Sequence, residues 1–171
     1  MIKAIRTAGL VVACLAACLA SAGCTASTTG TTRKMPELTL QQAKDRVLGQ
    51  ERKIVALVPE QAVIDKPFIN DKSPLMACRD TFKKWTGTAQ VNLAPGTDDT
   101  ALLDTLRDSV KKDEPWTVTD GTDTFGDRQL KVVHPDGTQL LVGVWKKPFS
   151  LQIDAASGCF DLPEYEYPNQ Y

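Results

Sequence analysis

Apolar residues recur with a helical period in the first part of the chain after residue 38. The stripe falls every three or four positions, at Leu40, Ala43, Val47, Ile54 and Val58. Gln50 and Glu51 interrupt this stripe. Thr39 followed by Gln42 is a capping box, and Pro59 closes the segment. The pattern therefore predicts a capped helix from residue 40 to about residue 58.

A second helix is predicted between Gly96 and Pro115. Thr97 or Asp98 can cap its start, and the acids Asp98 and Asp99 suit the positive end of a helix. Its apolar stripe consists of Leu102, Leu103, Leu106 and Val110. Pro115 cannot continue a helix and ends it.

The remaining segments alternate with the period of a β-strand. Four strands are predicted at 116–120, 128–134, 138–145 and 149–153. Pro135-Asp136-Gly137 forms the turn between the second and third of these. An earlier hairpin is expected to pair 75–82 with 88–93 about a turn at 85–87, and 60–74 is turn-rich and expected on the surface.

The order of these elements sets the expected fold class. Strands follow one another rather than alternating singly with helices, which is typical of an α+β fold. We expect a single antiparallel sheet with two helices packed on one face. The whole of 38–171 is expected to be one globular domain.

The chain begins with a short basic segment and an apolar core. Lys3 and Arg6 precede an apolar run at 10–20, which small residues follow. This pattern predicts a signal peptide at 1–23, and the run is shorter than the roughly 20 residues of a spanning helix. A Thr/Ser-rich tether is predicted at 24–37.

The end of this leader resembles the lipobox of bacterial lipoproteins, which are cut before a cysteine. The segment "SAGC" places Cys24 at that position, and the predicted anchor is a diacylglyceryl group with palmitate-type chains on its thiol. Two acyl chains anchor a protein stably. Two alternatives stay open: cleavage before Cys18, and release after Ala22 without a lipid.

Charge excludes one class of partner. Removing Lys3 and Arg6 from the 20 basic residues leaves 18 against 21 acids. A mildly acidic chain is not typical of nucleic-acid binders. We therefore expect no nucleic-acid partner, and contact with the membrane only through the N-terminal lipid.

Cys78 and Cys159 are the two cysteines outside the leader and Cys24. Disulfides are the usual state of paired cysteines in exported proteins, so a Cys78–Cys159 disulfide is predicted. It would tie the first hairpin to the exit of the last predicted strand. Two free buried thiols are the alternative.

Residues that could carry catalysis or bind metal are sparse. The single histidine, His134, lies at a hairpin end and is expected to be a solvated turn residue. Ser157 lacks the G-x-S-x-G context of a nucleophile. The acids Asp120, Asp123 and Asp127 only loosely resemble a calcium loop, and a surface turn is expected there. We predict no metal site and no cofactor.

Acidic, basic and aromatic residues also occur in short groups. No acid stands in an apolar setting that would raise its pKa, although carboxylates are numerous. The segments "CRDTFKKW" and "WKKP" mix Lys with aromatics and are expected to be solvated strand edges. The tyrosines Tyr165, Tyr167 and Tyr171 could bind a partner or pack back over the sheet.

Taken together, these motifs resemble those of small lipoproteins of actinobacteria. The shared features are the lipobox and tether, the capped helix, Cys78, the "PDGTQLLVGV" hairpin and the late "SGCF". Much of that group has no assigned activity. The resemblance implies a location in the cell envelope and one disulfide, and it carries over no catalytic residue.

We therefore expect a bacterial lipoprotein anchored on the extracytoplasmic face of the cell membrane. Its domain is expected to be non-catalytic and to bind an envelope component, with an envelope protein as one candidate partner. Two alternatives stay open: a carrier of a small ligand or lipid, and a carboxylate-dependent hydrolase.

Overall fold

The computed structural model describes residues 38–162, 164 and 171. The signal peptide, the tether and Cys24 therefore lie outside the described residues. The elements, in chain order, are α1 (Leu40–Ala56), the 3-10 turn η1 (Glu60–Ala62), β1 (Phe68–Asn70), β2 (Met76–Arg79), β3 (Phe82–Lys84), β4 (Thr86–Asn92), α2 (Asp99–Val110), β5 (Thr117–Thr122), β6 (Arg128–Val133), β7 (Gln139–Lys146), β8 (Phe149–Ala156) and β9 (Phe160–Asp161).

Both predicted helices form, with the predicted N-terminal caps. The Thr39 hydroxyl accepts the N–H of Gln42 at 3.2 Å, and the Gln42 side chain accepts the N–H of Thr39 at 3.0 Å. Asp98 caps α2 by accepting the N–H of Ala101. These bonds satisfy N–H groups that a helix start leaves without partners. Neither described helix is long and apolar enough to cross a membrane.

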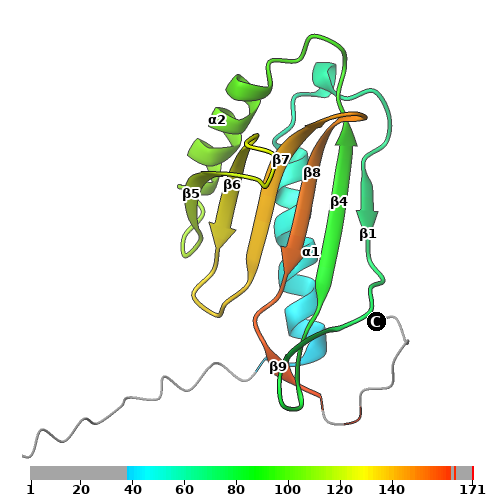
Figure 1. The fold of residues 1–171 in the computed structure, drawn as a ribbon, viewed down its shortest axis with the longest axis vertical. Helices are drawn as coiled ribbons and strands as arrows, with labels where there is room; N and C mark the ends of the chain where they lie inside the picture. Colours follow the sequence, from blue (N-terminus) through cyan, green and yellow to red (C-terminus); the bar gives the residue numbers. More distant parts are fainter. Residues whose placement is uncertain (1–37, 163, 165–170) are drawn as a thin grey trace, which may run out of the picture. The chain divides into compact units, whose positions relative to one another are not determined.

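The main sheet has six antiparallel strands in the order β1-β4-β8-β7-β6-β5 (Figure 1). The four strands predicted after residue 115 are its β5, β6, β7 and β8. Gly137 has a positive φ of 92° in the turn between β6 and β7, as the Pro-Asp-Gly sequence predicts. The α+β class is therefore confirmed.

The prediction of a single sheet is wrong, because a second sheet of three strands forms in the order β2-β3-β9. β4 and β8 pair as far as Thr86 and Ala156, and β3 and β9 pair beyond a break. At the break the N–H of Trp85 bonds to the Ser157 hydroxyl instead of a strand partner. The side-chain bond and one extra residue between Ala156 and Phe160 interrupt the ladder, as a bulge does.

The first hairpin also differs from the prediction. β2 pairs with β3 across a turn at Asp80, whose φ is +46°. Asp tolerates this left-handed conformation better than most residues, so the turn lies here rather than at 85–87. β4 pairs with β1 and β8 instead. The segment 60–74, expected to be surface turns, contains η1 and β1.

Both helices cover the same face of the six-stranded sheet. α1 lies behind β4 and β8 in Figure 1, and α2 contacts β5 and β6. The buried strand residues on this covered face are Ala89, Val91, Leu130, Val132, Leu140, Val142, Val144, Leu151, Ile153 and Ala155. The opposite side is the uncovered face, over which no described helix lies.

Candidate functional site

The two cysteines of the globular part form a disulfide. Cys78 lies in β2 and Cys159 lies between β8 and β9, with their Cα atoms 6.2 Å apart. The bond therefore joins the first hairpin to the exit of β8, and both the pairing and its place are confirmed. A cross-link over 81 positions constrains the unfolded chain and stabilises the second sheet.

His134 is not the solvated turn residue that the sequence predicts. Its side chain is only 16% exposed. Its Nδ1 lies 2.8 Å from the Asp136 carboxylate, and its ring packs against Trp116 with the centroids 4.9 Å apart. The turn is drawn inward because Arg46 of α1 also pairs with Asp136.

The Asp136 carboxylate is held as an anion within this turn. Burial raises its pKa, but hydrogen bonds from Thr138 and His134 and the positive charge of Arg46 outweigh burial, so its pKa lies below the usual value. Ser157, which the sequence does not favour as a nucleophile, is buried, and its hydroxyl accepts from the Trp85 N–H and donates to the carbonyl of Gly158. These polar side chains are engaged in holding the turn and the strand break.

The acidic segment after β5 forms a surface turn. Asp123 accepts the N–H groups of Phe125 and Asp127 at 2.8 and 2.9 Å. Asp120 instead pairs with Arg128 at 2.6 Å. Asp120 and Asp123 therefore have different partners, and in the described part of the chain no three acids, histidines or cysteines gather as a metal site would need.

One acid contradicts the expectation that none stands in an apolar setting. Glu51 is fully buried on α1, and neither of its carboxylate oxygens has a hydrogen-bond partner. Burial raises its pKa to about 8, against the lowering effect of Arg52. Its Oε1 lies so close to Gly87 that a Cβ there would approach within 2.5 Å, which explains the glycine in β4.

A second acid with a raised pKa lies across the sheet. Burial raises the pKa of Asp154 on β8, and a hydrogen bond from Thr88 partly opposes the rise. Asp154 shares the uncovered face with its Cα partner Thr88, whereas Glu51 lies on the covered face. Because the sheet separates these two carboxyls, they cannot act together on one bond as a hydrolytic pair.

The uncovered face carries the candidate binding site, which we call the Trp145 hollow. It is an open depression of about 490 Å³. Gln129, Trp145 and Asp154 line it from β6, β7 and β8, and the turn with Phe125 and Asp127 completes it. Trp145 is 52% exposed and Phe125 is 90% exposed. Large aromatic side chains beside polar groups are typical of binding surfaces.

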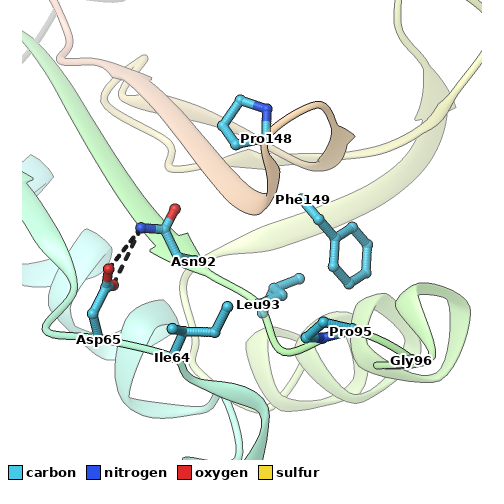
Figure 2. A pocket seen from close by; sticks show the side chains of 8 residues that line it. All are labelled: Ile64, Asp65, Asn92, Leu93, Pro95, Gly96, Pro148 and Phe149. Atoms are coloured by element: carbon cyan, nitrogen blue, oxygen red, sulfur yellow. Dashed lines mark hydrogen bonds between the residues drawn. The ribbon is translucent and has the colours of Figure 1, made fainter.

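A second depression, the end pocket, lies where β4 ends and the turn into β8 begins (Figure 2). It measures about 640 Å³. Leu93, Pro95 and Phe149 give it an apolar lining, as Figure 2 shows. At its edge Asn92 donates two hydrogen bonds to Asp65, at 3.0 and 3.2 Å. The pocket therefore suits an apolar group.

The residues of the basic and tyrosine-rich segments make different contacts from one another. In the segment "WKKP", Lys146 pairs with Asp99 of α2, and Lys147 lines the Trp145 hollow. Tyr171 packs back against the core, and its carbonyl oxygen accepts the Trp85 indole N–H at 2.9 Å. Tyr165 and Tyr167 lie outside the described residues.

Sequence reasoning missed the Trp145 hollow. A signal was present, because Trp145 has the opposite parity in β7 to the buried Leu140, Val142 and Val144. In a half-buried strand, such a tryptophan must point away from the core. Phe125 could not be placed over the same face, because its position depends on how the turn bends.

No family model matches the chain, and no curated protein matches it either. The fold is similar to that in a crystal structure of a DUF4853 family protein from Actinomyces odontolyticus ATCC 17982. The two chains are 14% identical, the match covers 78% of this chain and 75% of the other, and the TM-score is 0.42.

Proposed function

We propose that this protein is an exported, lipid-anchored bacterial lipoprotein whose domain is non-catalytic and binds a component of the cell envelope through the Trp145 hollow. The observation that carries the proposal is the half-exposed Trp145 beside a hollow on the uncovered sheet face. A folded domain gains little stability from an exposed tryptophan, whereas binding surfaces use it as an anchor.

The anchor is proposed from the leader alone, and Cys24 is its attachment point. Replacing Cys24→Ala should release the protein from the membrane fraction, since no thiol would remain there to carry the lipid. Cys18→Ala is the matched control and should leave the protein in the membrane. Retention of the Cys24→Ala variant would refute this anchor, and release of the Cys18→Ala variant would move it to Cys18.

The binding surface is tested by crosslinking in intact cells that produce the protein. A photo-crosslinking side chain placed at Leu141, which is 37% exposed on the uncovered face, should capture an envelope component. The same group at Asp108, which lies exposed on α2, is the control and should capture nothing specific. Equal capture at both positions, or none at Leu141, would overturn the proposed surface.

The end pocket favours a second candidate function, a carrier of a small apolar ligand. Its volume lies within the range of small-molecule sites, roughly 300–1,000 Å³. Ile64 at its edge is 62% exposed. Protein purified from its own cells should then release a bound apolar compound on solvent extraction, and an Ile64→Asp variant should release less. Extracts free of any such compound would remove this candidate.

A further inference from the structure

A row of neutral side chains crosses the uncovered face from one edge of the sheet to the other. Successive Cα partners place these residues side by side on all six strands. In the order of the strands they are Phe68, Gln90, Gln152, Gly143, Gln129 and Gly121. Three of the six are glutamines and none is charged. A glutamine amide both donates and accepts hydrogen bonds, and because Gln152 is only 8% exposed, the amides of this row that a ligand can reach are those of Gln90 and Gln129.

Gly143 lowers the surface in the middle of this row. It lies in β7, an interior strand, between Leu141 and Trp145 on the same face. A Cβ at Gly143 would meet its nearest neighbours at 3.6 to 3.9 Å, which is ordinary contact. Gly87, by contrast, has no room for a Cβ. Packing therefore demands glycine at Gly87 and not at Gly143.

A glycine at a strand position where a side chain would fit lowers the stability of the strand, so its presence there needs an explanation other than packing. Glycine inside a strand weakens it, and it often marks a place where a ligand approaches closely. Here it leaves one position of the uncovered face without a side chain, beside Gln129 and two residues before Trp145, although Gly143 itself is buried. The other two tryptophans, Trp85 and Trp116, are 0% and 8% exposed, so Trp145 is the one with an accessible ring face.

We propose, building on the proposed function, that the Trp145 hollow and the glutamine row bind a neutral saccharide chain. One sugar ring stacks on Trp145, within the hollow that Gln129 and Asp154 also line. Sugar C–H groups carry slight positive charge and suit the negative face of an aromatic ring. Gln129 and Gln90 exchange hydrogen bonds with the hydroxyl groups of the rings on either side.

The hollow carries charges of both signs, since Asp127 and Asp154 line it together with Lys147, and this mixture suits a ligand without a net charge. The Asp123 carboxylate is occupied by two backbone N–H groups, and Lys146 and Lys147 line the same hollow as the acids. A polyhydroxylated chain can use Asp154 as a hydrogen-bond partner without requiring a net charge.

The test measures saccharide binding to the full-length protein in detergent. The probes are chitotetraose, maltotetraose and mannotetraose, with putrescine as a cationic probe. Binding of one of the saccharides should protect Trp145 from acrylamide quenching, since the other two tryptophans are buried. No protection by any saccharide at millimolar concentration, or protection by putrescine alone, would overturn the proposal.

Three variants locate the binding. Trp145→Ala should weaken saccharide affinity at least tenfold, measured by calorimetry. Gly143→Ala should also weaken it while leaving thermal stability unchanged or higher, because the added Cβ meets its neighbours at ordinary contact distances and alanine lacks the backbone freedom of glycine. Ile64→Ala, an exposed apolar residue of the end pocket, should bind normally. Unchanged affinity in both the Trp145 and Gly143 variants would contradict the assigned site.

The crosslink at Leu141 separates this inference from the proposed function. A captured glycan would support both. A captured protein would overturn the saccharide while leaving the binding domain intact. Capture of nothing at Leu141 would overturn both.

Discussion

Each strand of the six-stranded sheet contributes alternate side chains to the covered face and to the uncovered face, and the two faces differ in character. In β8, Leu151, Ile153 and Ala155 point to the helices and are at most 7% exposed. Residues of the opposite parity, such as Gln152 and Asp154, point away from the helices. Strand geometry makes this division unavoidable, because successive side chains point to opposite faces.

Each face carries one carboxyl with a raised pKa, and the two differ in their surroundings. Glu51 is sealed between α1 and the sheet without a hydrogen-bond partner. Asp154 lines an open hollow and has Thr88 as a partner. The first arrangement only destabilises the fold, whereas the second places a polar group where a ligand can reach it. Both carboxyls have a raised pKa, so the pKa shift does not distinguish them. Access to solvent does, because a ligand can reach Asp154 and cannot reach Glu51.

The largest expected effect comes from cutting a side chain on the covered face. Ile153→Ala should destabilise the protein by roughly 2–5 kcal/mol, because it leaves a cavity in a packed core. Gln90→Ala, on the uncovered face, should cost less than about 1 kcal/mol, since its one side-chain hydrogen bond is with Asn92. Urea unfolding of both variants measures the difference. If both variants lost the same free energy of unfolding, the side chains of the uncovered face would contribute to packing as much as those of the covered face.

The next effect is the pH dependence that Glu51 imposes. Its pKa rises from 4.5 to about 8 on folding, so the folded state keeps a proton that the unfolded state loses. Stability should therefore be complete below about pH 4.5 and fall as pH rises toward 8. The loss at pH 7 is on the order of 3 kcal/mol.

Glu51→Gln tests this dependence, because the amide has nearly the same shape and no charge. The variant should match the unsubstituted protein near pH 4.5 and be more stable at pH 8, as thermal melts at both values would show. Glu60→Gln, at an exposed acid of η1, is the matched control and should change neither melt. A parallel fall in the Glu51→Gln variant would place the pH dependence elsewhere.

The sequence predicts most elements of the main sheet and both helices, because their patterns are local. Caps at Thr39 and Asp98 and the turn at Gly137 each depend on a few neighbouring residues. The division into two sheets could not be predicted in the same way. It depends on a hydrogen bond between Trp85 and Ser157, which are 72 positions apart.

The candidate site was harder to predict than the fold. The glutamine row exists only through the register of six strands, and no local pattern reveals that register. The burial of Glu51 had a partial signal in the sequence, because Glu51 interrupts the apolar stripe of its helix four residues after Val47. A polar residue on such a stripe is either at an edge or buried, and the stripe alone does not decide between them.

The smallest expected effect is that of Asp154→Asn, and it sharpens the comparison between the two carboxyls. Because Asp154 lies at an open hollow, water screens its charge, and the substitution should change stability by less than about 0.5 kcal/mol. Its negative charge also raises the pKa of Glu51. The variant should therefore leave the onset of the fall near pH 4.5, end it at a slightly lower pH and make the total loss slightly smaller. Thermal melts from pH 4 to 9 would detect this shift. If Asp154→Asn flattened the profile as fully as Glu51→Gln, the uncovered carboxyl would be as shielded from water as the covered one, and the distinction between the two faces would fail.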